Sequence, residues 1–184
     1  MFEKFIEEHT NVMKNLLTVK DKILNAIEVM KNAFNNKNKI IIMGNGGSAS
    51  DSLHFAGEIV GRYKRERKGY PAISLLETSV LTAIANDYSY EDVFSRQIEA
   101  LCVKGDVVFG ISTSGNSKNV INGIKKAKEI GAVTIGLLGK NGGEASRLVD
   151  IPIIVPSNNT PRIQEAHIFI IHYICEIIEE SFYA

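Results

Sequence analysis

Cysteine, long apolar runs and an excess of either charge are what this sequence has little of. Its two cysteines, Cys102 and Cys175, lie in apolar helical patterns, and no CxxC or other zinc-finger spacing is present. We therefore expect two reduced core thiols, as in a cytoplasmic protein. No apolar run approaches the roughly 18 residues that span a bilayer, and the first residues lack the apolar stretch of a secretory signal. The sequence thus predicts no membrane partner.

The chain also lacks a net charge, with 21 basic and 21 acidic residues. That balance argues against non-specific nucleic-acid binding, which needs a basic surface. One segment departs from it, since Arg62–Lys68 holds five basic residues in seven. Two interpretations stay open for this segment: a solvated loop, and a basic rim that attracts an anionic substrate.

The composition that is present is ordinary for a soluble globular protein. Of 184 residues, 45% are hydrophobic and 23% are charged. That length predicts a single domain, residues 1–184, with a core of its own. We find no linker and no low-complexity segment.

The first 36 residues read as a helical segment, in which apolar side chains recur at helical spacing from Phe2 to Phe34. A break is expected at Asp21 or Asn25. This apolar stripe precedes any strand that it could cover. It either packs on a partner subunit, as an oligomerisation segment, or folds back on the core of its own chain.

Five apolar runs then predict buried strands, and helical patterns separate most of them. The last helix is expected at about Pro161–Glu180, with Thr160 as its candidate N-cap. Strands that alternate with helices predict an α/β fold with a five-stranded parallel sheet covered by helices on both faces. The predicted strands are Lys39–Met43, Ala72–Leu76, Val107–Ile111, Val133–Leu138 and Ile151–Val155; the predicted helices between them are Ser50–Val60, Ser79–Ala85, Glu91–Val103, Ser117–Ile130 and a short piece near Glu144–Leu148.

Two loops rich in glycine and hydroxyl groups, Gly44–Ser48 and Ser112–Ser117, follow the first and third predicted strands. Ligands of open parallel sheets bind at the carboxyl ends of the strands. Glycines, hydroxyls and the free N–H groups of a helix N-terminus suit a phosphate. We therefore predict a phosphate-monoester site, against the alternative of plain capped turns. A near copy of the first loop, Asn141–Ser146, carries Glu144, which would repel a phosphate, so we interpret it as a turn.

A rival interpretation uses the same glycines. Gly44–Ala49 fits the G-x-G-x-x-[GA] fingerprint of dinucleotide-binding proteins, with Glu77 as the acid that would bind a ribose. Glu77 lies about thirty residues further on, whereas the usual separation is ~20. This interpretation also leaves the second hydroxyl loop without a role.

Two pairs of polar side chains lie over a hundred residues apart and follow loops of small polar residues. His54 and Glu58 are four residues apart, so a helix projects them from one face. Gln164 and His172 are eight apart, a little over two turns, and face roughly the same way. Imidazole, carboxylate and amide oxygen make a plausible metal site, and imidazole with carboxylate also makes a general acid/base pair. Spacing alone is equally typical of surface pairs.

Four further polar residues are assigned supporting roles. Glu165 is expected at the surface or an interface, because it points about 100° away from its neighbour on a helix. His167 is expected beside the site or at an interface, and His9 at the surface or an interface. Asp51 either orients His54 or caps a helix.

At these loops and pairs the sequence resembles the sugar-isomerase (SIS) domain family, and within it the enzymes that act on heptose phosphates. The Ser-Thr-Ser-Gly-Asn-Ser loop at Ser112–Ser117 marks the broad family, and its combination with His54, Glu58, Gln164 and His172 is more specific. The matching segments run in order over nearly the whole chain: Gly44–Ser48, His54–Glu58, Gly61–Tyr63, Gly69–Ile73, Asn86–Asp87, Phe94–Arg96, Gly110–Ser117 and Arg162–His167.

The resemblance implies a flavodoxin-like SIS sandwich that assembles as a homotetramer with active sites between subunits. It also implies one zinc ion per active site, held by His54, Glu58, Gln164 and His172. The sugar phosphate would be bound by the following residues: Asn45, Gly46, Gly47, Glu58, Asn86, Asp87, Ser112, Thr113, Ser114, Ser117 and Gln164.

The implied reaction converts sedoheptulose 7-phosphate to D-glycero-D-manno-heptose 7-phosphate, the first step toward activated heptose for a bacterial surface polysaccharide. Ketose–aldose interconversion through an enediol needs a base, an acid and a group that stabilises oxyanion charge. Glu58 is the candidate base, His172 the candidate acid and zinc the candidate Lewis acid. Whether Glu58 is base, ligand or both stays open, since a carboxylate bound tightly to zinc is a poorer base. The alternative is a non-catalytic SIS-family scaffold, one of which binds a bacterial replication initiator.

Overall fold

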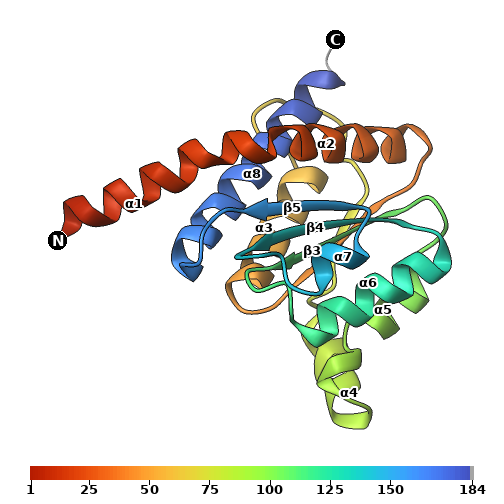
Figure 1. Cartoon of the computed structure of the whole chain (residues 1–184). Helices are drawn as coiled ribbons and strands as arrows, with labels where there is room; N and C mark the ends of the chain where they lie inside the picture. The colour runs from red at the N-terminus through yellow and green to blue at the C-terminus, as the bar shows by residue number, and fades with distance from the viewer. Residues whose placement is uncertain (183–184) are drawn as a thin grey trace.

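Five strands form one parallel sheet in the computed structural model, which describes residues 1–182 (Figure 1). Their order across the sheet is β2-β1-β3-β4-β5, so the predicted five-stranded parallel α/β fold is confirmed. In this flavodoxin-like order the direction of winding reverses between β1 and β3, and ligands bind at the carboxyl ends of these two strands. The strands are β1 Ile40–Gly44, β2 Ala72–Ser74, β3 Val107–Ser112, β4 Val133–Gly139 and β5 Ile151–Val155.

Helices cover both faces of the sheet, which explains why the central strands are apolar at every position. All residues of β1 and β3 are buried. On one face α2 (Lys20–Asn35), α3 (Gly47–Val60) and α8 (Thr160–Ser181) pack over the sheet. On the other face lie α5 (Ser95–Leu101), α6 (Lys118–Ile130) and the short α7 (Ala145–Leu148). None of the helices in this described part of the chain is both long and apolar enough to cross a membrane.

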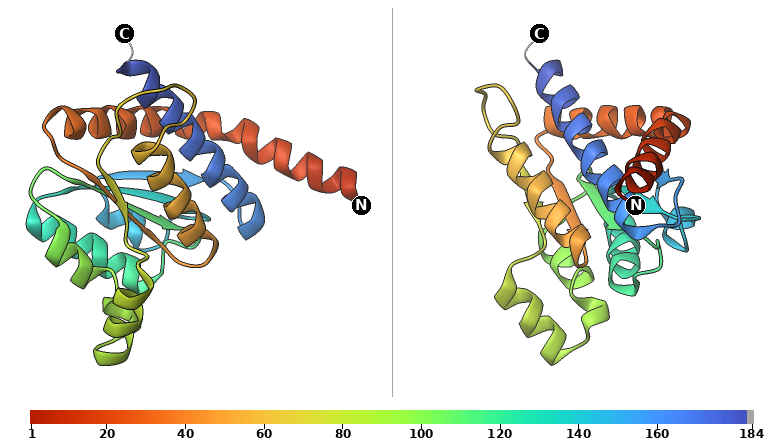
Figure 2. Two further views of the ribbon diagram at one scale, coloured as in Figure 1. Left: turned by 180° about the vertical axis from the view of Figure 1, so that it is seen from behind. Right: turned by 90° about the vertical axis from the view of Figure 1, so that its left-hand side faces the viewer.

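The N-terminal helical segment divides into two parts with different surroundings. α1 (Phe2–Asn15) is followed by a 3₁₀ turn, η1 (Leu16–Val19), and then by α2. We predicted a break at Asp21 or Asn25, and the observed break lies earlier, at Leu16–Val19. Thr18 lies in it and donates a hydrogen bond to the carbonyl of Asn15. α2 folds back on the core of its own chain, whereas α1 runs past the start of α8 and projects beyond the sheet (Figure 2).

Two other helix boundaries differ from prediction in ways that matter for the site. α3 begins at Gly47, three residues before the predicted Ser50, so the first glycine loop leads directly into the helix. α8 begins at Thr160, and its N-cap is Asn159, whose extended backbone (φ −91°, ψ 111°) is typical of that position. The prediction of Thr160 as N-cap was thus wrong by one residue.

Beyond β2, the chain forms an outlying helix before it returns to the sheet. α4 (Thr78–Asp87) has no buried residue and stands apart from the sandwich (Figures 1 and 2). A short turn, η2 (Tyr90–Asp92), separates it from α5, so the single helix predicted at Glu91–Val103 is shorter than expected.

Candidate functional site

A cavity of about 140 Å³ lies where β1 and β3 end, at the reversal of strand order. Both predicted loops contribute to it, as does the first turn of α8. This is the position at which open parallel sheets bind ligands. The lining residues are Asn45, Ser48, Ile111, Ser112, Thr113, Ser117 and Gln164.

The first loop is shaped by two glycines that allow a close approach of helices. Gly46 has a positive φ of 56°, which a residue with a side chain rarely adopts. A Cβ atom on Gly47 would collide with the side-chain amide of Gln164. Glycine at these positions therefore brings the N-terminus of α3 beside the first turn of α8.

Asn45 is held by two residues that sequence reasoning missed. Its side chain and that of Asn119, on α6, donate a hydrogen bond to each other at 2.8 and 2.9 Å. The hydroxyl of Tyr90 also donates to the Asn45 side-chain oxygen, at 3.0 Å. Asn119 is a buried polar residue beside buried Val120, and this departure from the apolar pattern is the signal that could have revealed it.

The second loop folds its own hydroxyl groups together. Ser112 Oγ accepts the backbone N–H of Gly115 at 3.1 Å and lies 3.2 Å from Ser117 Oγ. Ser117 is the N-cap residue of α6, but its side chain caps no backbone N–H. The N-terminus of α6 is thereby left open toward the cavity, and such a terminus favours an anion.

The near copy of the first loop forms a turn, as predicted, and supports the second loop from behind. The backbone N–H of Ala145 donates to the carbonyl of Gly115 at 2.9 Å. The N–H of Glu144 donates to the side chain of Asn116, also at 2.9 Å. Gly115 has a φ of 66°, and a Cβ atom there would collide with the carbonyl of Gly142.

His54, Glu58 and His172 come together on the facing sides of α3 and α8. Glu58 Oε1 lies 3.0 Å from His54 Nε2 and 3.5 Å from His172 Nε2, and the two Nε2 atoms are 3.4 Å apart. The Glu58 side chain is 15% exposed, and both imidazoles are more open. Cys175 lies against Glu58, and burial, followed by the charge of that carboxylate, raises the pKa of its thiol, which is therefore neutral.

These three donors fit a shared divalent metal ion. Ligands 2.0–2.1 Å from a tetrahedral zinc ion lie about 3.3–3.4 Å from one another, close to the three separations found here. Each Nε2 atom faces the other imidazole and the same carboxylate oxygen, and a cation between them would satisfy all three lone pairs. The donor set, with two imidazoles and one carboxylate, is one that zinc accepts.

The structure places the other predicted site residues around this cluster and the cavity. Gln164 lies in the cavity against Gly47, about two turns of α8 before His172. Asn86 and Asp87 are at the exposed end of α4, hydrogen-bonded to each other at 2.8 Å, and do not line the cavity.

Two of the supporting residues have surroundings that sequence reasoning did not foresee. His167 is fully buried, with Nε2 3.1 Å from the carbonyl of Leu138, so its placement beside the site or at an interface was wrong. Burial lowers its pKa to about 4. Asp51 makes no helix cap: its Oδ2 is buried without a hydrogen-bond partner among residues 1–182. Burial raises its pKa to about 6, and the nearby His54 acts in the opposite direction.

The remaining predictions concern surface residues and cysteines. His9 and Glu165 form a half-exposed pair at 2.7 Å between α1 and α8, as expected for the surface. Cys102 and Cys175 are buried free thiols, which confirms that they belong to the core. The basic segment Arg62–Lys68 was predicted as a solvated loop or as a basic rim. Neither prediction describes Arg67, because its side chain is only 5% exposed and pairs with buried Glu179.

Comparison with known proteins relates this geometry to one family. The family model of the SIS domain matches residues 4–139. A phosphoheptose isomerase of Aliarcobacter butzleri is 51% identical over 182 residues, which cover 98% of this chain and 96% of that protein. One from Helicobacter pylori (strain Shi470) is 51% identical over 181 residues, covering 98% of this chain and 94% of that protein.

Solved structures show the same fold. Phosphoheptose isomerase GmhA from Neisseria gonorrhoeae has a TM-score of 0.92 and 39% identity, with 97% of each chain covered. A phosphoheptose isomerase from Francisella tularensis has a TM-score of 0.94 and 29% identity, with 97% of this chain and 96% of that one covered. The chain therefore belongs to the SIS domain family and, within it, to the phosphoheptose isomerases.

Proposed function

We propose that this chain converts sedoheptulose 7-phosphate to D-glycero-D-manno-heptose 7-phosphate. The observation that carries the proposal is a hydroxyl-lined cavity and a His–Glu–His cluster placed along the same two helices. The names of its full-length relatives support the same activity. The product would then enter activated-heptose synthesis for a surface polysaccharide.

The distance between the phosphate cavity and the His–Glu–His cluster matches the length of a heptose phosphate. His54 follows Ser48 by six residues on α3, and His172 follows Gln164 by eight on α8, which gives about 9 and 12 Å of helical rise. An extended chain advances about 1.1–1.2 Å per bond, so C2 and C1 of a 7-phosphate lie roughly 8–10 Å from phosphorus. A phosphate in the cavity therefore places the reacting carbons at the cluster.

The cavity residues bind the phosphate end of the substrate. The hydroxyls of Ser112, Thr113 and Ser117 and the N-terminus of α6 donate hydrogen bonds to it, while Gln164 and Asn45 border the sugar chain. Of the other residues, Gly46 and Gly47 let the backbone approach, and Ser114 shapes the second loop through its bond to the N–H of Asn116. We also propose that Asn86 and Asp87 bind the substrate, because the end of α4 that carries them is exposed and stands apart from the sandwich.

Glu58 and His172 move the protons. Glu58 takes a proton from C1 of the ketose, while His172, whose Nε2 would bind the metal, donates one from Nδ1 to the C2 carbonyl oxygen, and a cis-enediol results. In the second half, His172 takes the proton from the C1 hydroxyl and Glu58 returns one to C2, which forms the aldose. Zinc, when bound, would stabilise negative charge on the two sugar oxygens as a Lewis acid.

We propose zinc as the metal, with His54, Glu58 and His172 as ligands; Gln164, which the resemblance implies as a fourth donor, lies about 12 Å of helical rise from His172 and we assign it to the sugar chain instead. The fit of the three donor separations to a tetrahedral ion supports the first three assignments. Metal analysis of protein purified in zinc and then dialysed tests this proposal. We expect one zinc ion per chain, lost from a His54→Ala variant, and a wild-type protein without bound zinc would contradict it.

Substrate length provides the test of the reaction. A ketose 5-phosphate has two bonds fewer between phosphorus and the reacting carbons, and therefore falls about 2 Å short of the cluster. A misplacement of this size costs about 100-fold or more. We expect kcat/KM to fall from sedoheptulose 7-phosphate through fructose 6-phosphate to ribulose 5-phosphate, and equal values for the three would contradict the placement.

Two alternative functions are less well supported. A non-catalytic scaffold is not favoured, because the relatives that match the whole chain are isomerases and the acid/base residues are intact. A dinucleotide-dependent enzyme would leave the hydroxyl groups of the second loop without a role, although Ser112, Thr113 and Ser117 line the same cavity as Asn45 and Ser48.

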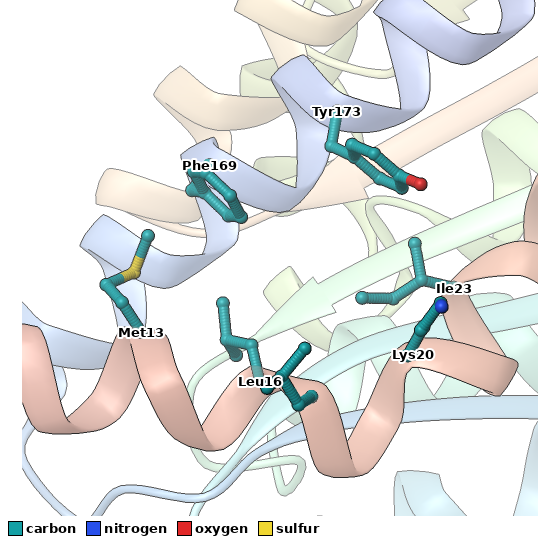
Figure 3. A pocket seen from close by; sticks show the side chains of 7 residues that line it. Met13, Leu16, Lys20, Ile23, Phe169 and Tyr173 are labelled. Atoms are coloured by element: carbon teal, nitrogen blue, oxygen red, sulfur yellow. The ribbon is translucent and has the colours of Figure 1, made fainter.

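We further propose a homotetramer with active sites between subunits, in which α1 and η1 form the oligomerising part of residues 1–36, because α2 packs on the core of its own chain. The exposed apolar side chains of α1 and η1 support this, with Phe2 at 73% and Leu17 at 77% exposure. An apolar groove between η1 and α8, seen in Figure 3, continues that surface; its lining is Met13, Leu16, Leu17, Lys20, Ile23, Phe169 and Tyr173. Light scattering should give four times the 20.3 kDa chain mass. We also propose that the enzyme is cytoplasmic, because its substrate and product are charged metabolites.

A further inference from the structure

A buried ion pair joins the ends of the two helices that carry the His–Glu–His cluster. Arg67, in the loop after α3, places Nε 3.1 Å from Oε2 of Glu179 near the end of α8. Their side chains are 5% and 3% exposed. The two residues are 112 positions apart, so the contact is purely tertiary.

On one side of the pair, Arg67 closes the C-terminal end of α3. Its Nη2 donates to the carbonyl of Glu58 at 2.7 Å, and its Nη1 donates to the carbonyls of Ile59 at 3.0 Å and Lys68 at 3.1 Å. The carbonyls of Glu58 and Ile59 are among those that the end of α3 leaves without partners within the helix. The guanidinium thus holds the backbone of Glu58 itself.

On the other side, Glu179 fixes the loop that leaves α3. Its two carboxylate oxygens accept the backbone N–H groups of Tyr63, Lys64 and Arg65 at 3.0, 2.9 and 2.7 Å. These hydrogen bonds hold the pKa of Glu179 below its usual range despite the burial. The carboxylate therefore stays charged and anchors the loop to α8.

The pair consequently constrains the distance across the cluster. Glu179 lies seven residues after His172 on α8, about two turns and on the same face. Tyr63, fixed by Glu179, lies with its ring centroid 5.8 Å from that of His172. We propose that Arg67 and Glu179 are positioning residues that set the separation of Glu58 and His172, and with it the affinity of the cluster for a metal ion.

Stability alone does not account for this arrangement. A buried ion pair adds little to folding compared with apolar residues of similar volume. Within residues 1–182, each hydrogen bond that Arg67 donates goes to a backbone carbonyl or to Glu179, and none goes to an exposed acid. Such a pair specifies one relative placement of two helix ends.

The inference depends on the proposed metal site, and its test separates the two. Glu179→Gln keeps the side-chain shape and removes the charge, while Arg67→Lys keeps the charge and removes the planar fork. Glu176→Gln is the matched control, because Glu176 lies one turn earlier on α8 and its ion pair with Lys64 is exposed. The double variant Arg67→Met/Glu179→Leu removes both charges together, so it leaves no buried charge without its partner.

Three measurements are made on each variant: zinc affinity by competition with a chelator, kcat and KM, and the Glu58–His172 distance in a crystal structure of metal-free protein. We expect zinc to bind about 10- to 100-fold more weakly in the Arg67 and Glu179 variants, the range for groups that orient metal ligands. We expect kcat to fall with it and KM to change less than about twofold, since the phosphate cavity is distant. The Glu176 variant should match wild type.

Folded variants with wild-type zinc affinity, kcat and Glu58–His172 distance would overturn the inference, even if they melted at a lower temperature. A wild-type protein that bound no zinc would instead contradict the proposed metal site. In that case the crystallographic distance still decides the positioning role, because it is measured without metal.

Discussion

Gly115→Ala tests whether the phosphate loop depends on the turn behind it. Gly115 has a φ of 66°, and a Cβ atom there would meet the carbonyl of Gly142. A side chain in this left-handed conformation costs about 1–2 kcal/mol. Moving the loop away to relieve the collision breaks the hydrogen bond from the N–H of Ala145, worth about 0.5–1.5 kcal/mol.

The two contributions together predict a loss of about 1.5–3.5 kcal/mol in the free energy of unfolding. A protein of this size starts from roughly 5–15 kcal/mol, so the variant still folds. Its melting temperature should fall by roughly 3–14 °C, at about 2–4 °C per kcal/mol. Because the displaced loop carries Ser112 and Ser117, KM for sedoheptulose 7-phosphate should rise about tenfold, equivalent to one hydrogen bond to a charged group.

Gly57→Ala is the matched control for this experiment. Among residues 1–182, no atom apart from the neighbouring backbone of α3 lies within 4 Å of a Cβ atom placed on Gly57, which is inside that helix. Replacing a helical glycine by alanine raises the free energy of unfolding by up to about 1 kcal/mol. Thermal unfolding followed by circular dichroism, with steady-state kinetics, gives both quantities. A Gly115→Ala protein with wild-type melting temperature and KM would refute the described contact between the two loops.

Further predictions concern single side chains. Glu58→Gln and His172→Gln should each abolish turnover with little change in melting temperature, and a fully active double variant would contradict their assignment. Asn119→Ala removes both hydrogen bonds to Asn45 and should raise KM about fivefold, the value of one hydrogen bond of ~1 kcal/mol; an unchanged KM would count against the pairing. His167, with its pKa near 4, stays neutral in the folded state while the unfolded chain binds a proton below about 6.5. Stability is therefore complete above pH 6.5 and declines by up to about 3 kcal/mol as the pH falls to 4; urea unfolding of His167→Gln should lack this decline, and the same decline in the variant would show that another group causes it.

The sheet could be predicted from the sequence because its strands are buried on both faces. β5 was predicted with its observed bounds, β1 is shifted by one residue at both ends, and β3 ends one residue later than predicted. Their continuous apolar runs need no knowledge of the partner strand. The position of the two ligand loops followed from the same rule, since parallel strands bring their carboxyl ends to one edge.

Contacts between distant segments could not be predicted in this way. Arg67 lies in a run of charges that resembles a solvated loop, and its buried partner Glu179 is 112 residues away. Tyr90 and Asn119 meet Asn45 across 45 and 74 residues. His167 was misplaced because helical spacing shows which residues share a face, but not that this face of α8 packs on β4.

The most direct measurement is a one-proton NMR time course with sedoheptulose 7-phosphate, run with zinc and with a chelator. New anomeric signals of the aldose with zinc, lost on chelation, are the predicted result, because both the cavity and the metal cluster would then be needed. Signals of equal rate in both conditions would contradict the role of the metal. No signals in either condition, from a folded protein, would contradict the isomerase itself.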